Sequence, residues 1–368
     1  MKKILYIGHE YHLKTRSTIF IQEILSSRYD LETFSIDPNQ ENIDGLINID
    51  LEKYQLIVLL QVDYLASYFL KRNKPTVVIP MYDASGNLNE SHWKAINRSL
   101  VVSFSFMIHN RVQQLGLDSI YLKYFPKNDT KAKNLERKPE QKLKVFFWER
   151  LPDSKINEKN IIKLINNLPI ETLYIHEAHD PGRNKLRLDN IDQNFKIIRS
   201  KWFDNKNDLI DIISNTDLYI APRYSEGIGQ GFLEAMSLGC CVIANDDSTH
   251  NEYIKNWENG ILVNFYNENF GSLNADIATI RTICSNALND ANLLRKSWED
   301  FYKDIFIRGI DEYISNFLVI DSKESLRPKI VDKLLATEEL KKLCYAHVDW
   351  EEYYLYLENI INETKNEL

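Results

Sequence analysis

The sequence predicts an α/β protein built from two doubly wound parallel sheets. Short apolar runs alternate with helical patterns from the first residues onward, the order that builds strand–helix–strand units. The runs are continuously apolar, as expected of strands that helices cover on both faces. This alternation is interrupted once, over the polar residues 126–142, and then resumes. The length of 368 residues suits two domains of ordinary size.

The first half of the chain begins with a buried strand rather than a signal peptide, because its apolar part is short and polar residues follow at once. Helical patterns over residues 16–27 and 63–72 lie between the apolar runs. The predicted strands of this half are 4–8, 31–36, 56–61, 76–81, 100–105 and 119–124.

The second half follows residues 126–142, which have the charge and the flanking prolines of a linker. Its predicted strands are 143–148, 171–176, 194–200, 217–222, 240–245 and 260–263, with helices at 157–168 and 205–214. From about residue 273 the pattern is helical to the end. We therefore expect residues 1–135 and 136–345 to form two domains, and 346–368 to form a helix that packs back toward the first. Ligands of such sheets bind outside the carboxyl ends of the strands, so a cleft between the domains is the expected site.

Composition excludes several classes of function. The net charge is −8, and no dense basic face is available for nucleic acid. No apolar run approaches the length of a membrane-spanning helix. The first 140 residues are less acidic than the rest, which leaves peripheral association with an anionic membrane surface open.

Cysteine usage favours a cytoplasmic protein, with the inner face of a membrane as a second location. The four cysteines show no CxxC spacing, and two of them, Cys240 and Cys241, are neighbours in an apolar run. Reduced core thiols are therefore expected.

Residues 225–239, SEGIGQGFLEAMSLG, predict an anion site. Gly227, Gly229 and Gly231 follow a buried strand and open a helix, where unpaired N–H groups and the positive end of the helix dipole face a ligand. Glu226 and Glu234 flank this glycine ladder, and because carboxylates repel phosphate, we expect neutral hydroxyls as their partners. A tight turn with a capping glutamate is the simpler alternative.

The longer stretch PRYSEGIGQGFLEAMSLGCCVIANDDSTHNEYIKNWENGILV resembles the donor-binding core of retaining glycosyltransferases with the GT-B fold, family 4 type. The shared signature is a Glu-x7-Glu pair within EGxGxxxLEAMxxGxxVIA. ERLPDSKI, directly after a predicted strand, is similar to the GRLxxxKG motif of the same family and supplies Arg150 and Lys155 at the right spacing. Without that family, both residues would be read as surface charges.

The resemblance implies a GT-B fold, with two Rossmann-like domains facing a cleft and C-terminal helices crossing back. It also implies a nucleoside diphosphate sugar as donor substrate, with no further cofactor. Arg150 and Lys155 would neutralise the diphosphate, Glu226 would hold hydroxyls of the transferred sugar, and Glu234 would hold the ribose. The remaining donor-site residues would be Gly227, Ile228, Gly229 and Leu233. No metal is expected, because the sequence has no DxD motif in a suitable setting.

The chain departs from the family in its first half. The loop after the first strand, GHEYHLKTRST, has a single glycine, and its His9 and His12 are candidate cleft residues or simply solvated. Tyr82 stands where many members carry histidine. Asp83 keeps the second position of that motif and is the second catalytic candidate, beside Glu226; a turn residue is the alternative. Glu149 replaces the glycine of GRL.

The function expected from these patterns is retaining, metal-independent transfer of a hexosyl group to a hydroxyl of a glycan, glycolipid or protein. A nucleotide-sugar epimerase of the same fold would share the donor site. An NAD(P)-dependent oxidoreductase is a further alternative, since the ladder resembles a shortened GxGxxG with Asp246 or Asp247 following it. An inactive partner subunit would keep the fold alone. The sugar, base, acceptor and oligomeric state are not encoded in these spacings.

Overall fold

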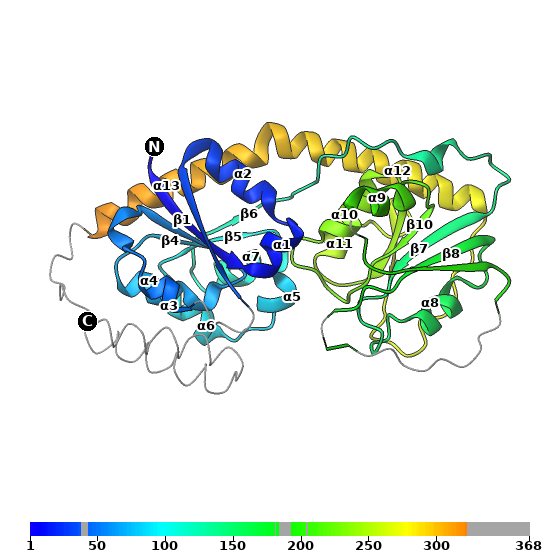
Figure 1. Ribbon diagram of the computed structural model, residues 1–368, viewed down its shortest axis with the longest axis horizontal. Helices are drawn as coiled ribbons and strands as arrows, with labels where there is room; N and C mark the ends of the chain where they lie inside the picture. The colour runs from blue at the N-terminus through cyan, green and yellow to red at the C-terminus, as the bar shows by residue number, and fades with distance from the viewer. Residues whose placement is uncertain (38–42, 181, 184–192, 204, 322–368) are drawn as a thin grey trace. The chain divides into compact units, whose positions relative to one another are not determined.

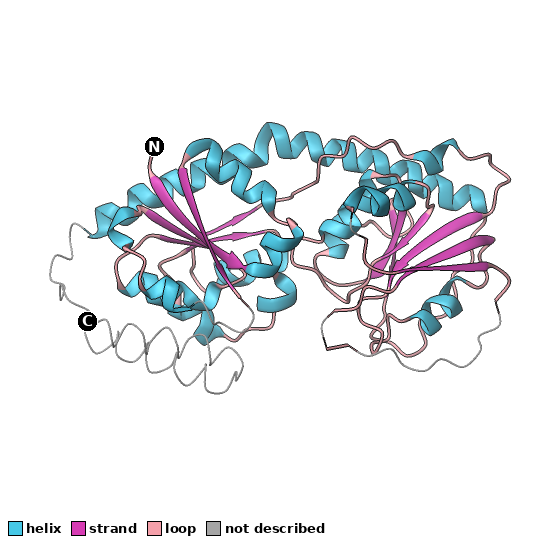
Figure 2. Ribbon diagram, in the orientation of Figure 1, coloured by secondary structure: helices cyan, strands magenta, loops and turns pink. Residues whose placement is uncertain are grey.

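Parallel strand pairing organises both halves of the chain. The computed structural model describes residues 1–37, 43–180, 182–183, 193–203 and 205–321. They contain two six-stranded sheets, and helices cover both faces of each sheet (Figure 2). Every strand pair is parallel, as the continuous apolar runs predicted. The described residues divide into two compact units, one formed by residues up to 122 together with 300–321, the other by residues between 123 and 299.

The first sheet has the strand order β2-β1-β3-β4-β5-β6. Its strands are β1 (Lys3–His9), β2 (Asp30–Ile36), β3 (Leu56–Leu60), β4 (Thr76–Ile79), β5 (Leu100–Ser103) and β6 (Ser119–Tyr121). The helices of this unit are α1 (Glu10–Thr15), α2 (Ile19–Arg28), α3 (Ile43–Ile47), α4 (Ala66–Lys71), α5 (Tyr82–Ser85), α6 (Glu90–Ala95), α7 (Phe106–Gln114) and α13 (Lys303–Asp321), with 3-10 turns η1 (Leu51–Lys53) and η2 (Asp63–Leu65).

All six strands predicted in this half are present. β3, with the sequence LIVLL, is buried along its whole length, which explains why it shows no polar alternation. β4 ends at Ile79, two residues earlier than predicted, because Pro80 cannot donate a ladder hydrogen bond. The strand order changes direction between β1 and β3, so the loops that follow these two strands lie at a switch point.

The second sheet has the order β12-β11-β10-β7-β8-β9. Its strands are β7 (Leu143–Trp148), β8 (Ile170–His176), β9 (Lys196–Ser200), β10 (Leu218–Ile220), β11 (Cys241–Asn245) and β12 (Gly260–Val263). The helices are α8 (Glu158–Ile165), α9 (Lys206–Ser214), α10 (Gln230–Ser237), α11 (His250–Tyr253) and α12 (Ile277–Ser297), with the 3-10 turn η3 (Lys133–Glu136) before the sheet and the π-helical turn η4 (Trp298–Tyr302) after α12.

The core of this unit is formed by the inward faces of the central strands and of α8 and α12. α8 begins where the Asn157 side chain accepts a hydrogen bond from the N–H of Asn160. Ile161, Leu164 and Ile165 then recur at helical spacing and are buried. Cys240, Cys241 and Cys284 are buried free thiols, as expected of a reduced core. The predicted linker 126–142 contains no strand and only the turn η3.

α13 belongs to the first unit, where it lies along α2 (Figure 1). Arg28 and Tyr29, at the end of α2, both contact the Asp311 carboxylate, at 3.0 and 3.1 Å. The chain thus divides at 122/123 and 299/300, whereas the sequence placed the boundaries at 135/136 and 345/346. The expected final helix, 346–368, lies outside the described residues. Within the described ranges, no helix is long and apolar enough to cross a membrane.

We predict that Tyr313→Phe destabilises the first unit. The buried Tyr313 hydroxyl accepts a hydrogen bond from the Thr76 N–H (3.1 Å) and donates to the Arg98 carbonyl (2.7 Å). Losing it leaves two backbone groups unsatisfied, at a cost of about 1–2 kcal/mol in the free energy of unfolding, measurable by urea denaturation. Ser315→Ala, on the exposed side of α13, is the control and should change stability by less than about 0.5 kcal/mol. Equal losses in the two variants would contradict this account.

Candidate active site

The glycine ladder lies at the carboxyl edge of the second sheet. β10 ends at Ile220 and α10 begins at Gln230, so residues 221–229 connect the strand to the helix. β10 is paired with β7, and β11 and β12 extend to one side of this pair while β8 and β9 extend to the other. Ligands of doubly wound sheets bind at such a switch point. The ladder therefore occupies the part of the sheet where a ligand is expected.

Gly229 is required for the entry into α10. Its φ of +79° lies in the left-handed region, and a Cβ added there would come within 1.9 Å of the Phe232 ring. Gly229 is also the N-cap residue, and no side chain hydrogen-bonds to the cap. Gly239, which has a φ of +75°, directly follows the last turn of α10 and ends it. The first turn of α10 thus presents its backbone N–H groups without a side-chain cap.

Tyr219 of β10 is a buried tyrosine near the predicted charged residues. Its side chain is 1% exposed, and its ring stacks on Phe146 of β7 at 5.7 Å. Burial raises the pKa of the Tyr219 hydroxyl well above its ordinary value; the carboxylates of Glu226 and Glu234 raise this pKa further, and Arg150 lowers it. All three side chains therefore lie close enough to act electrostatically on one buried hydroxyl.

The two glutamates of the ladder are held in different ways. Glu226 is half-buried, and its backbone N–H donates to the Ser248 carbonyl at 3.3 Å, which ties the loop after β10 to the loop after β11. Glu234, near the middle of α10, accepts a hydrogen bond from Lys206 Nζ of α9 at 2.5 Å. The Glu234 side chain is 18% exposed, so its carboxylate is oriented by an ion pair at the rim of the ladder.

Arg150 is part of a charged group drawn from three neighbouring strands. It follows β7, and its guanidinium contacts Asp180 Oδ1 at 2.8 Å through Nε and at 2.7 Å through Nη2. Asp180 follows β8, and its other oxygen accepts from Arg223 Nη2 at 2.8 Å. Arg223 follows β10 on the loop that leads to Glu226. The Arg150 guanidinium also lies 5.1 Å from the centre of the Trp148 ring.

Lys155 lies beside a stacked pair of tyrosines. Its backbone N–H donates to the Tyr224 hydroxyl at 2.9 Å, and its ammonium donates to the Tyr266 carbonyl at 3.1 Å. The centres of the two tyrosine rings are 5.0 Å apart, and the ring planes are nearly parallel, with an angle of 11° between them. The Tyr266 hydroxyl donates to Asp247 at 2.6 Å. Asp247 is therefore engaged by a tyrosine in this structure.

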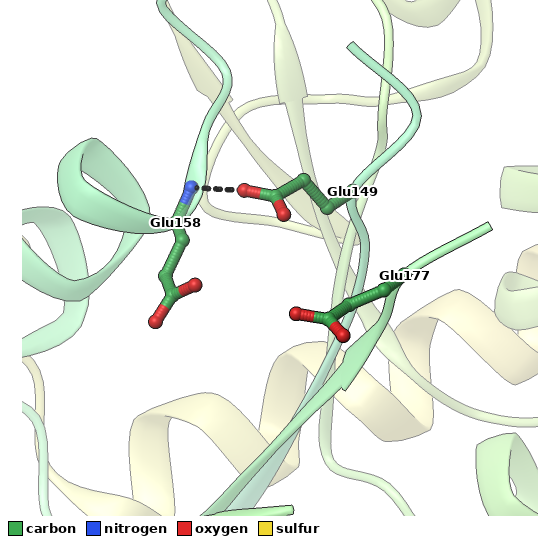
Figure 3. A group of neighbouring side chains, drawn as sticks. All are labelled: Glu149, Glu158 and Glu177. Atoms are coloured by element: carbon green, nitrogen blue, oxygen red, sulfur yellow. Dashed lines mark hydrogen bonds between the residues drawn. The ribbon is translucent and has the colours of Figure 1, made fainter. Parts of the chain in front are cut away.

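Glu149, the residue that replaces glycine in the GRL motif, has a structural role. Its Oε1 accepts a hydrogen bond from the Glu158 N–H at 2.9 Å and so supports the start of α8 (Figure 3). Glu149, Glu158 and Glu177 each place an oxygen within 4.8 Å of the others, the one group of three such side chains in the described ranges that could hold a metal ion. Arg199 already donates to both oxygens of Glu158 and to Glu177, at 2.6–2.9 Å. A resident guanidinium thus supplies positive charge to this cluster.

His176 and His250 of the second unit are packing residues. Burial lowers the pKa of His176 to about 4, and its ring stacks on Phe203 at 5.0 Å. Burial also lowers the pKa of His250 to about 4, beside the Phe232 ring. Both rings are therefore neutral at pH 7.

The first unit brings its own predicted residues to the carboxyl edge of its sheet. His9 ends β1, and its Nδ1 accepts the Tyr11 N–H at 3.2 Å, which caps α1. His12 contacts Ser17 Oγ at 3.0 Å and, through Nε2, the side-chain oxygen of Gln61. Gln61 directly follows β3 and has a left-handed φ of +57°. The contact between His12 and Gln61 therefore joins the loops after β1 and β3, at the switch point of this sheet.

Tyr82 and Asp83 open the short helix α5, just after β4. Tyr82 is half-buried and Asp83 is exposed. Burial lowers the pKa of His12, whereas the Gln61 hydrogen bond and the Asp83 charge raise it, so Asp83 lies near His12. The Ser85 hydroxyl of α5 donates to the buried Asp63 carboxylate at 3.2 Å, which fixes the helix on the unit.

The structure therefore groups the predicted donor residues in the second unit and the predicted acceptor residues in the first, and their roles remain predictions. The sequence reasoning did not single out Asp180, Arg223, Tyr224, Tyr266 or Gln61. A signal existed for Arg223, which stands between a predicted strand and the ladder. The contacts of the other four residues form only when distant segments of the chain come together, so the sequence around them gives no signal.

Comparison with known proteins finds a similarity to glycosyl transferases in part of the chain and to solved structures over most of it. Residues 128–280, from just before η3 into α12, match the family model of glycosyl transferases group 1. No curated protein matches the sequence. Solved structures share the fold, which is GT-B: two six-stranded parallel sheets with flanking helices, followed by C-terminal helices.

Three of these structures illustrate the similarity. HepE (Alr3699) from Anabaena, in complex with UDP and glucose, is 16% identical, with a TM-score of 0.53 over 86% of this chain and 100% of that chain. Sucrose-phosphate synthase from Thermosynechococcus elongatus is 14% identical, with a TM-score of 0.55 over 84% and 100%. The lipopolysaccharide outer core galactosyltransferase WaaB, in its apo form, is 13% identical, with a TM-score of 0.51 over 85% and 99%.

We predict that Gly229→Ala costs more stability than Gly271→Ala. Both glycines have a left-handed φ, +79° and +75°, but a Cβ at position 271 would meet nothing within 4 Å. The backbone cost, about 1 kcal/mol, is therefore common to both. The clash with Phe232 should add about 1–3 kcal/mol for Gly229→Ala alone, measured by chemical denaturation. Equal effects would mean that the turn into α10 is not constrained as described.

Proposed function

We propose that this protein is a retaining glycosyltransferase that moves a hexosyl group from a nucleoside diphosphate sugar to a hydroxyl acceptor. One observation carries the proposal: β10 pairs with β7, so the loop that carries Glu226 to the start of α10 lies beside the loop that carries Arg150. Carboxylates suited to hydroxyls and a cation suited to phosphate thus come from two adjacent strand ends. The match to glycosyl transferases group 1 covers these residues.

The diphosphate is assigned to Arg150, Lys155 and the first turn of α10. A guanidinium offers paired N–H donors, an ammonium offers a point charge, and the helix start offers backbone N–H groups. Gly227, Ile228 and Gly229 would present backbone to the phosphate and sugar, and the buried Leu233 would pack beneath them. The complex of HepE with UDP and glucose supports a donor of this chemical class.

The sugar and ribose hydroxyls are assigned to the two glutamates. Glu226 lies on the loop directly before the helix start and would accept hydrogen bonds from the transferred sugar. Glu234 lies further along α10 and would accept from the ribose, with Lys206 orienting its carboxylate. Because each carboxylate faces hydroxyls rather than phosphate, the negative charges of the protein and the donor stay apart.

The acceptor is assigned to the carboxyl edge of the first sheet. Asp83 is exposed there, close to His12, and would orient the acceptor hydroxyl. Both ring nitrogens of His12 are engaged by Ser17 and Gln61, so His12 and the neighbouring His9 and Tyr82 would shape the site rather than exchange protons. The acceptor class is a glycan, glycolipid or protein hydroxyl.

In the transfer step, the acceptor oxygen bonds to the anomeric carbon from the face that the diphosphate leaves. The bond between that carbon and the phosphate oxygen breaks, and its electron pair stays with the nucleoside diphosphate. The acceptor proton passes to a phosphate oxygen. Arg150 and Lys155 stabilise the charge that develops on the leaving group, which usually is the largest single contribution to catalysis. Because these cations face the diphosphate, we propose that no divalent metal is needed.

A nucleotide-sugar epimerase of this fold would use the same donor residues but would need no acceptor. An oxidoreductase would leave the two glutamates and Lys155 unexplained. The transferase and the epimerase differ in their products, because only the transferase releases one nucleoside diphosphate for each sugar that it moves to an acceptor.

We predict that Glu226→Gln lowers turnover about 100-fold or more. The sugar hydroxyls lose a charged hydrogen-bond acceptor, and the hydrogen bond to it would become stronger in the transition state. UDP-, GDP-, ADP- and TDP-sugars would be incubated with candidate acceptors, and NMR would follow both nucleoside diphosphate release and the anomeric signal of the product. Retention of the donor configuration is expected.

Glu258→Gln is the matched control, because Glu258 is an exposed glutamate of the same unit, 61% exposed and paired with Lys255. Its turnover should equal that of the wild type. Unimpaired turnover in a folded Glu226→Gln variant would reject the assigned site, and an inverted product would reject the retaining mechanism.

A further inference from the structure

Arg223 belongs to a charged group that the donor residues described above do not include. β10, β7 and β8 are neighbours in the second sheet, and each is followed by a member of this group, which consists of Arg223, Arg150 and Asp180. Parallel strands end at the same edge, so the three side chains come from three adjacent strand ends. This edge includes the switch point between β7 and β10, where the glycine ladder lies.

Asp180 holds the two arginines from opposite sides. Arg150 takes one carboxylate oxygen at 2.7–2.8 Å, and Arg223 takes the other at 2.8 Å. The Asp180 N–H donates to the Arg150 carbonyl at 3.0 Å, which also fixes the backbone of the pair. The side chains of Arg150, Asp180 and Arg223 are 14%, 18% and 27% exposed, so the triad is largely desolvated.

The charge of this triad exceeds what an ion pair requires. One arginine would neutralise Asp180, and the second leaves the three groups with a net charge of +1. Concentrating positive charge in a partly desolvated place costs free energy, because the guanidinium ions repel each other and lose hydration. This net positive charge suits an edge that binds a multivalent anion.

We propose that Arg223 is a third diphosphate-binding cation of the donor site, and that Asp180 is a positioning residue that sets Arg150 and Arg223 side by side. The inference rests on the proposed function. Arg223 lies three residues before Glu226 on the same loop, and Arg150 acts on the same Tyr219 hydroxyl as Glu226. The two arginines would contact different oxygens of the diphosphate, while Lys155 contacts it from the loop after β7.

The test is isothermal titration of the full chain with UDP, GDP, ADP and TDP, with the corresponding nucleoside monophosphates, and with inorganic pyrophosphate. We expect Arg223→Gln to weaken the tightest nucleoside diphosphate about 10- to 100-fold, the effect of losing a charge-assisted contact. Arg223→Lys should recover part of this loss. The monophosphate should be affected less than the diphosphate, a difference that a general structural defect would not produce. Arg308→Gln, an exposed arginine paired with Asp304 in the first unit, should bind as the wild type does.

Replacing Asp180 tests whether the affinity for the anion rises or falls when its carboxylate is removed. Removing a negative charge beside an anion site would strengthen binding by charge alone, so a positioning role predicts the opposite. We expect Asp180→Ala to weaken pyrophosphate binding and to reduce the further effect of Arg223→Gln in the double variant, because the two residues then share one function. Tighter binding by Asp180→Ala would overturn the positioning role.

The outcomes separate this inference from the proposed function. Unchanged diphosphate affinity in Arg223→Gln, with weakened affinity in Arg150→Gln and Lys155→Gln, would reject the role of Arg223 and keep the donor site. A wild-type protein that binds none of the four nucleoside diphosphates would reject both.

Discussion

The pairing of β10 with β7 is the constraint on which the candidate site depends. It places the loop that carries Glu226 and the glycine ladder beside the loop that carries Arg150 and Lys155, although some seventy residues separate them in the sequence. The pairing is buried throughout, since Leu218 and Ile220 are 0% exposed and Tyr219 stacks on Phe146. Hydrophobic burial of the strands thus fixes the positions of the polar groups at their carboxyl ends, where ligands of such sheets bind.

The same edge separates positive from negative charge over a short distance. Arg150, Arg223 and Lys155 follow β7 and β10, and Glu226 and Glu234 flank the first turn of α10. Under the proposed function, the ligand carries phosphate and hydroxyl groups together, as a nucleoside diphosphate sugar does. Four of these five charged groups are oriented by a named partner: Asp180 for the two arginines, Tyr266 for Lys155 and Lys206 for Glu234. Such preorganisation is what electrostatic catalysis requires.

Local patterns predicted the strands and the α10 turn, because burial on both faces and a left-handed backbone leave direct marks in the sequence. The continuous run LIVLL became the buried β3, and the glycine ladder leads into α10 as expected. Contacts between distant segments of the chain are not indicated by any local sequence pattern. Asp180 lies in a polar loop, and nothing near it predicts that it joins Arg150 to Arg223. Glu149 was recognised as a departure from the family motif, but its support of α8 depends on three-dimensional packing. The path of α13 back onto α2 likewise depends on Asp311 meeting Arg28 and Tyr29.

The most direct test of the central claim is amide hydrogen exchange of the intact chain, followed by mass spectrometry with and without each nucleoside diphosphate and NAD(P). If the first turn of α10 and the loop after β7 hold a diphosphate, one nucleoside diphosphate should slow exchange in peptides covering residues 226–233 and 149–156, because bound N–H groups no longer open to water. Peptides from the exposed part of α12 should exchange as before. Protection of the ladder by NAD(P) alone, or by none of these ligands, would contradict the account.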